Sequence, residues 1–119
     1  MYAFRVIEPK HYKDAGELRE KLINAHIYSG EPCSCGCGKL LTEPCSMHHG
    51  ILPKSIWRGK KPKDRKENHP YNCFMVNDEC HEGDPEWYYQ VACKRYGRGN
   101  VEIWYHKVQG MFKSILPVF

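Results

Sequence analysis

Two adjacent histidines, His48 and His49, are the side chains of this sequence that best suit hydrolytic chemistry. An imidazole changes its protonation state near neutral pH, so it can take a proton from a water molecule. Neutral imidazole also binds divalent cations, which act as Lewis acids. Asn72 and His81 follow nine residues apart and can complete such a group. These residue types favour a metal-assisted hydrolysis.

Seven cysteines form a second chemical pattern. Their number is odd and no secretion signal is recognised, so metal binding is favoured over disulfides. Tetrahedral zinc takes four ligands, and a chain of 119 residues gains stability from such a centre. We expect two of Cys33, Cys35 and Cys37 to bind zinc with Cys45 and Cys80. Cys73 is a reserve ligand or a core residue, and Cys93 is a core residue.

Positive charge is concentrated between the two expected strands, although the net charge is only +4. The cations of this segment are Lys54, Arg58, Lys60, Lys61, Lys63, Arg65 and Lys66. Such a segment can neutralise several phosphates of DNA, with weak or no sequence specificity. The alternative is a solvated charged loop. Trp57 within the segment is interpreted as an anchor in the core rather than a stacking residue.

The expected elements of the first half are an extended segment at residues 2–8 and a helix at 13–28 that ends before Gly30. Residues 31–39 (EPCSCGCGK) are expected to be irregular because cysteines alternate with Ser and Gly. A strand or hairpin arm is expected at 40–52, a loop at 53–70 and a second strand at 71–76. His26 is interpreted as a partly buried helix residue.

In the second half, Asp84 and Pro85 predict a helix start, and Gly97 a stop after Tyr96. Asn100 is expected to cap a last helical stretch. The expected organisation is one compact domain with an N-terminal extension (1–30), a core (31–97) and a C-terminal helical extension (98–119). His11, His69 and His106 are interpreted as surface residues.

Two segments of this α+β chain together resemble the HNH endonuclease family. Residues 72–81 (NCFMVNDECH) resemble the family pattern N-L-x-P-L-C-x-x-C-H, with the Asn and the final Cys-His in register. Residues 45–51 (CSMHHGI) resemble the family's Asp/His-His element, which follows a zinc-knuckle cysteine. The resemblance covers about residues 33–95. It departs at Asn77, where the pattern has a cysteine, and the extra cysteines of C-x-C-x-C compensate.

The resemblance implies a ββα-metal (HNH) core with a structural zinc site and flanking helices. It implies that His49 is the general base, that His48 and His81 bind a catalytic divalent ion, and that Asn72 orients the base or joins the metal shell. The roles of His48 and His49 can also be exchanged, because the register against Pro53 is ambiguous. Mg²⁺, Mn²⁺, Ni²⁺ and Zn²⁺ all suit such ligands.

The resulting expectation is a metal-dependent endonuclease that nicks duplex or branched DNA, or cuts both strands as a homodimer. A non-catalytic, zinc-stabilised nucleic-acid-binding module is the main alternative, and a zinc-knuckle protein adaptor is a third. Small stand-alone HNH proteins of this kind are typical of phage. Because no run approaches the ~20 apolar residues of a membrane span, we expect no membrane association and a cytoplasmic location, in the host cell if the protein is phage-encoded.

Overall fold

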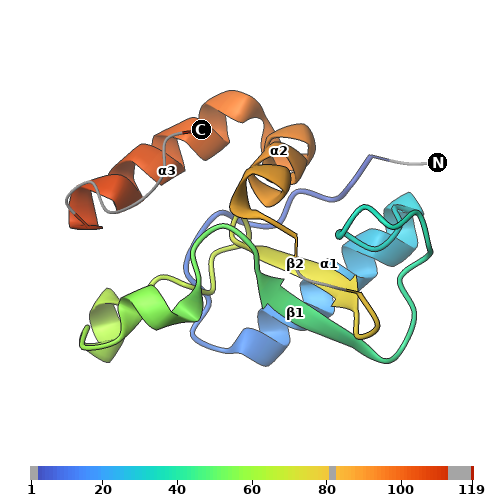
Figure 1. Ribbon diagram of the computed structural model, residues 1–119, viewed down its shortest axis with the longest axis horizontal. Coiled ribbons are helices and arrows are strands. Elements are labelled where there is room, and N and C mark those ends of the chain that lie inside the picture. The colour runs from blue at the N-terminus through green and yellow to red at the C-terminus, as the bar shows by residue number, and fades with distance from the viewer. Residues whose placement is uncertain (1–2, 81–82, 113–118) are drawn as a thin grey trace.

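A computed structural model describes residues 3–80, 83–112 and 119, and arranges them as a small α+β fold (Figure 1). The elements are α1 (Ala15–Ser29), β1 (Cys45–His49), β2 (Cys73–Asn77), α2 (Pro85–Tyr96) and α3 (Arg98–Phe112). Two short 3-10 helices, Lys54–Trp57 and Pro62–Asp64, interrupt the loop expected at 53–70. The predicted α+β class is confirmed.

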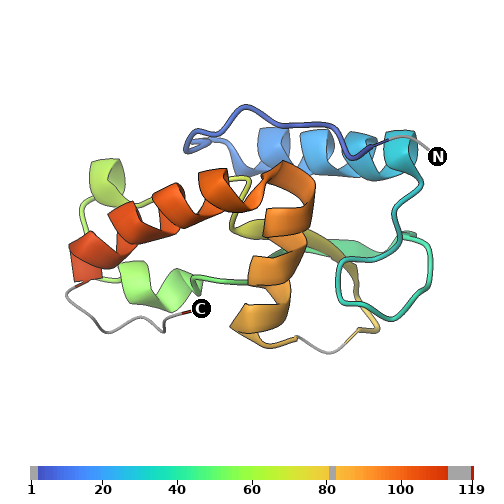
Figure 2. The same cartoon turned by 90° about the horizontal axis from the view of Figure 1, so that it is seen from above.

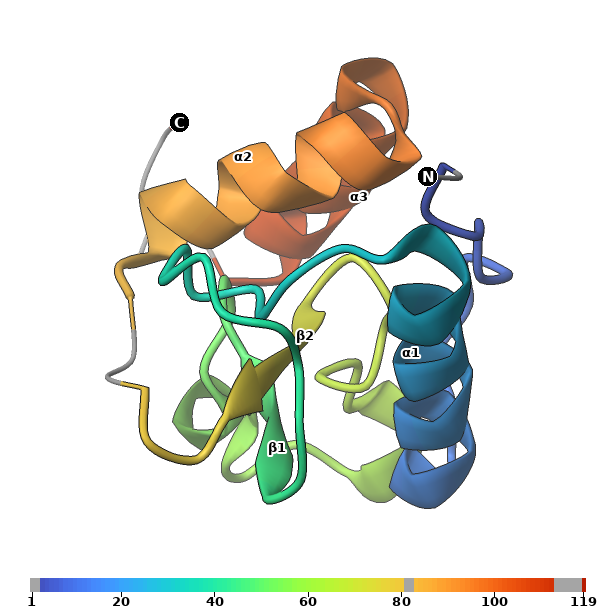
Figure 3. The same cartoon turned by 90° about the vertical axis from the view of Figure 1, so that its right-hand side faces the viewer.

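The two strands pair antiparallel, from Cys45 opposite Asn77 to His49 opposite Cys73. His48 and Phe74 are directly opposite each other in this pairing, so their side chains lie on the same face of the sheet. Both contact the ring of Tyr88 on α2, at centroid distances of 5.1 and 4.8 Å. The other face contacts α1, and Figure 3 shows the two helices on different sides of the sheet.

Helix α1 begins two residues after the expected start at residue 13 and ends at Ser29, just before Gly30 as expected. The Asp14 carboxylate accepts hydrogen bonds from the backbone N–H groups of Gly16 and Glu17, which satisfies two N-terminal donors. Leu18 and Leu22 are fully buried on one face. Gly30 adopts a φ of 73° and donates its N–H to a carbonyl of the last turn, which ends the helix.

Helix α2 also follows its prediction, because Asp84 caps it and Gly97 ends it. The expected cap at Asn100 is wrong. Helix α3 begins at Arg98, directly after α2, and the Asn100 amide donates to the carbonyl of Tyr96 instead. Figures 1 and 2 show α3 lying over the segment that links the strands. There the fully buried Trp57 ring packs against the Phe112 ring in a T-shaped arrangement, with 5.0 Å between the ring centroids.

The two expected strands need correction in their bounds, whereas residues 2–8 were expected only to be extended. Residues 3–8 lie outside the sheet, although Phe4 and Ile7 are buried. The arm expected at 40–52 is regular only at 45–49, and the second strand is shifted to 73–77. Among the described residues, no helix is both long and apolar enough to cross a membrane.

Candidate metal centre and hydrolytic site

Four cysteine sulfurs converge at one end of the sheet. The Sγ atoms of Cys33, Cys35, Cys37 and Cys80 all lie within 4.8 Å of one another. Neighbouring sulfurs are separated by 3.3 Å (Cys33 to Cys35), 3.5 Å (Cys33 to Cys80) and 3.7 Å (Cys80 to Cys37). No other group of three or more His, Cys, Asp or Glu ligand atoms comes so close together in the described part of the chain.

These separations fit a metal ion such as zinc. A Zn–S bond is about 2.3 Å, so the sulfurs of a tetrahedral centre lie about 3.8 Å apart. The observed separations are close to that value, and Asn77 also donates its backbone N–H to Cys33 Sγ at 3.2 Å. A donor aimed at sulfur stabilises the negative charge of a bound thiolate. Four thiol ligands leave no position for water, which is typical of structural zinc.

The loop that carries three of these cysteines is shaped by backbone contacts. Cys33 donates its N–H to the carbonyl of Lys39 at 2.9 Å, so the C-x-C-x-C segment folds back on itself. Gly36 has a φ of 89°, and an added Cβ would lie 2.7 Å from the Trp87 ring. Only glycine suits both conditions. Trp87 in turn donates its indole N–H to the carbonyl of Ser34 at 2.9 Å, which fixes the loop to α2.

The four thiols do not ionise independently. The backbone N–H of Lys39 lowers the pKa of Cys37 to about 7. In contrast, a hydrogen bond with Cys35 raises the pKa of Cys80, and burial raises that of Cys35. One negative charge therefore forms readily and opposes the next. A divalent cation removes this conflict, so metal binding releases the remaining protons.

The other cysteines stand apart from this group. Cys45, an expected ligand, begins β1, and its Sγ lies 3.7 Å from the Arg19 guanidinium. The expected ligand set is therefore wrong in one member, because all three cysteines of C-x-C-x-C join Cys80. Cys73 is fully buried and donates its S–H to the carbonyl of Glu67. Cys93 is buried, as expected of a core residue.

His48 and His49 face opposite sides of the sheet. His48 is half-buried against Tyr88 and lines a pocket with Ser46 and Asp78. Gly50 makes this packing possible, because an added Cβ would lie only 2.5 Å from the Tyr88 ring. His81, the predicted partner of His48 at the metal, follows the ligand Cys80 in sequence and lies outside the described residues.

His49 has a partner that the sequence did not indicate. Its Nε2 lies 2.9 Å from the side-chain oxygen Oδ1 of Asn68. An amide oxygen only accepts, so this bond assigns the proton to Nε2 and leaves the lone pair on Nδ1. Asn68 is itself held by Tyr12, whose backbone N–H donates to the Asn68 carbonyl at 3.0 Å. The only sequence signal for Asn68 is its position directly before His69 and Pro70.

Asn72 does not have its expected role. Its carboxamide is fully buried, and the oxygen accepts N–H groups of Ile51 and Leu52 at 3.2 and 2.7 Å. Its Nδ2 donates to the carbonyls of Leu52 and Glu67, both at 3.0 Å. All four hydrogen-bonding positions of the amide are used. Asn72 therefore fastens the two ends of the cation-rich segment, and it has no atom left for a metal or for an imidazole.

The seven cations of that segment divide into two groups. Those whose side chains are exposed are Lys54, Arg58, Lys60, Lys61 and Lys63. Arg65 pairs at 2.7 Å with the buried carboxylate of Glu67, and Lys66 donates to the carbonyl of Lys63. Five cations thus remain available to an anionic partner. Contact with DNA stays a prediction.

His69 differs from its expected surface position. It is buried, its ring stacks on Trp104 at 5.3 Å, and its Nδ1 accepts the backbone N–H of Tyr71. Burial lowers the pKa of His69 to about 4, so this imidazole is neutral at pH 7. His26 is buried in α1, as expected, and its Nδ1 lies 3.0 Å from the carbonyl of Glu31. Neither ring belongs to the candidate hydrolytic site.

No protein-family model, no curated protein and no solved structure matches this chain.

Proposed function

We propose that this protein is a metal-dependent DNA endonuclease of the HNH type, with a ββα core formed by β1, β2 and α2. The observation that carries the proposal is the pairing of His49 with Asn68, at the end of the strand that leads into five exposed cations. An imidazole with its proton held on one nitrogen and a lone pair on the other suits a general base. The adjacent cations suit a polyanionic substrate.

In this proposal His49 accepts the proton of the attacking water through Nδ1. Asn68 is a positioning residue, since its Oδ1 fixes the orientation of the ring. His48 faces α2 in the pocket with Asp78, and the two side chains offer the imidazole and carboxylate donors that a divalent cation takes. A bound cation would supply a Lewis acid for the phosphate. His81 is its further proposed ligand.

The two histidines can serve one phosphate only from the edge of the strand, because they face opposite sides of the sheet. Both are half-exposed, and β1 pairs with a strand on one side only. A phosphodiester that lies across the free edge can therefore approach both rings. The exposed lysines of the linking segment would hold the neighbouring phosphates.

One observation favours the alternative, a zinc-stabilised module that binds nucleic acid without cutting it. The four cysteines are the only assembled ligand group among the described residues. Such a module needs the cysteines and the cations but does not need His48 or His49.

Plasmid nicking by the zinc-loaded protein with added Mg²⁺, Mn²⁺ or Ni²⁺ tests the proposal. We expect His49→Ala to reduce the rate by roughly 10²- to 10⁴-fold, which is the usual contribution of a general base. Asn68→Ala should cost about 10- to 100-fold, as for other groups that orient a working imidazole.

His106→Ala and Asn24→Ala are matched controls, since both residues are exposed on helices away from the site. Both variants should nick at the wild-type rate. If folded wild-type protein binds DNA and cuts it with none of the three metals, the binding module replaces the endonuclease.

A further inference from the structure

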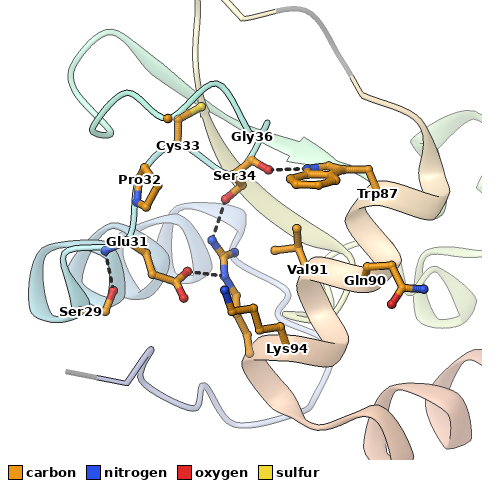
Figure 4. A pocket seen from close by; sticks show the side chains of 12 residues that line it. Ser29, Glu31, Pro32, Cys33, Ser34, Gly36, Trp87, Gln90, Val91 and Lys94 are labelled. Carbon is orange, nitrogen blue, oxygen red and sulfur yellow. Dashed lines mark hydrogen bonds and ion pairs between the residues drawn. The ribbon is translucent and has the colours of Figure 1, made fainter. Parts of the chain in front are cut away.

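A pocket of about 550 Å³ lies between the cysteine loop and α2 (Figure 4) and does not include His48. Cys33 lines this pocket, whereas Cys80 lines the pocket of His48. Its volume falls within the range that holds a small ligand. None of its residues takes part in the hydrolytic site proposed above.

The walls of the pocket are flat and apolar. Trp87 and Pro32 stand on opposite sides, with Val91 and Lys94 of α2 between them (Figure 4). Trp87 is 45% exposed, whereas Trp57 is fully buried and Trp104 is 9% exposed. The indole is held by its bond to Ser34 and by contact with Gly36. A fixed, exposed indole is suited to stack on another aromatic ring.

The polar groups of the pocket favour a ring that carries negative charge. Arg95 bonds Glu31 through Nε and Ser34 through Nη2, both at 2.9 Å, so the Glu31 charge is already neutralised. Its guanidinium is only 3% exposed, and Nη1 has no hydrogen-bond partner. Lys94 is exposed beside it. An excess of one positive charge therefore borders an apolar slot.

We propose that this pocket binds an unpaired nucleobase, which stacks on Trp87 while its phosphate pairs with Lys94. The proposal rests on the proposed nucleic-acid function and extends it to a second contact with the substrate. A base stacked on an aromatic side chain, with cations along the backbone, is the general mode of single-strand binding. Gln90, exposed at the rim, offers its side-chain N–H groups to a base edge.

Fluorescence anisotropy with a labelled single-stranded DNA of about eight nucleotides tests this pocket, with zinc-loaded full-length protein and no added divalent cation. Trp87→Ala should weaken binding roughly 5- to 150-fold, the loss expected for one stacked base. Lys94→Gln should weaken binding less than Trp87→Ala does. It should also reduce the slope of log K against log salt concentration by about 1, the value for one phosphate contact. Ile103→Ala and Lys107→Gln, exposed on α3, are the matched controls and should bind as wild type.

An abasic strand of the same length separates base from phosphate. It should bind as weakly to wild-type protein as intact DNA binds to Trp87→Ala. Equal binding of abasic and intact strands would overturn the proposal, as would a Trp87→Ala variant that binds like wild type.

In the wild-type protein Trp87 is the tryptophan that acrylamide reaches most readily, because Trp57 and Trp104 are buried, so its quenching tests the pocket without any substitution. Intact DNA should quench its emission and protect it from acrylamide, and the abasic strand should do neither. Quenching by deoxyadenosine monophosphate as well would show that a free nucleotide suffices, whereas quenching by the strand alone would assign the pocket to DNA. Absence of quenching by both would reject the pocket. Binding without nicking would leave this inference standing and remove the endonuclease.

Discussion

Two cysteines expected to bind zinc, Cys45 and Cys80, have different surroundings in the structure. Cys80 lies 3.5 Å from Cys33, while Cys45, at the start of the neighbouring strand, has an arginine beside its sulfur instead. Both were expected to bind zinc together with two cysteines of C-x-C-x-C. The register of the sheet decides between them, and spacing along the chain does not contain that register.

Cys80→Ser should abolish stoichiometric zinc, whereas Cys45→Ser should retain it. Loss of a direct ligand should exceed the 10- to 100-fold loss of affinity that an outer partner causes. Metal content by mass spectrometry, with affinity by competition against a chromophoric chelator, measures both variants. Retention of zinc by Cys80→Ser at wild-type affinity would contradict the assignment.

Asn72→Ala should lower the free energy of unfolding by at least about 3 kcal/mol, because three buried backbone groups lose their hydrogen-bond partner and the Glu67 carbonyl keeps only the weak Cys73 S–H donor. Asn24, exposed on α1, provides the matched substitution and should change stability by about 0.5 kcal/mol or less. Urea unfolding followed by circular dichroism compares the two. A metal-binding role for Asn72 would predict a loss of activity without this loss of stability.

At the level of elements, the helices were predictable where local chemistry determines their ends. Asp84 caps α2, and Gly30 and Gly97 end α1 and α2, all as expected, whereas the Asp14 cap starts α1 two residues later than expected. The expected cap at Asn100 was wrong because α3 begins directly after Gly97, the glycine that ends α2. Asn100 therefore already lies in the first turn of α3. The bounds of the strands were less predictable. Each strand has only five paired residues, and the packing of α1 and α2 against the sheet, rather than the local sequence, determines where pairing begins and ends.

Arg95 links elements that the sequence could not connect. It joins α2 to Glu31 and Ser34 of the cysteine loop, and its guanidinium lies 4.1 Å from the Phe4 ring of the N-terminal segment. The sequence gives no local signal for these contacts, because the two partners of Arg95 lie 61 and 64 residues away.

Arg95→Ala should therefore destabilise the protein by about 3–5 kcal/mol, since Glu31 is left without its counter-charge in a largely buried setting. Arg98→Ala, which removes an exposed hydrogen bond to Gln90, should cost less than about 1 kcal/mol. Thermal unfolding of the two variants side by side measures the difference. Equal melting temperatures would show that the buried pair contributes no more than the exposed one.

The whole molecule should become less stable in mild acid, and His69 is one cause. Its pKa is about 4 when folded, whereas an unfolded chain holds histidine near 6.5. Between these two pH values His69 binds a proton in the unfolded state but not in the folded state, so the free energy of unfolding falls as pH falls. Above about pH 6.5 the contribution is fully present. The total loss down to pH 4 is on the order of 3 kcal/mol.

Urea unfolding of zinc-loaded protein at several pH values between about 7 and 4 measures this decline. His69→Gln should show a shallower decline than wild type, and His106→Gln, exposed on α3, should not differ from wild type. Release of zinc in acid acts in the same direction in all three proteins and is removed by the comparison. A decline as steep in His69→Gln as in wild type would exclude His69 as a source.

The unequal spacing of the four clustered cysteines along the sequence has a consequence for folding during synthesis. Three ligands lie within five residues, whereas Cys80 comes 43 residues after Cys37. During synthesis the first three cysteines leave the ribosome well before Cys80, so they can capture an ion first. The chain then needs only one encounter, that of Cys80 with a preformed half-site, to bring β2 next to the N-terminal third. Closing a loop of this length costs little more than closing one half as long, about 0.6 kcal/mol, so zinc supply during translation should set how promptly the nascent chain folds.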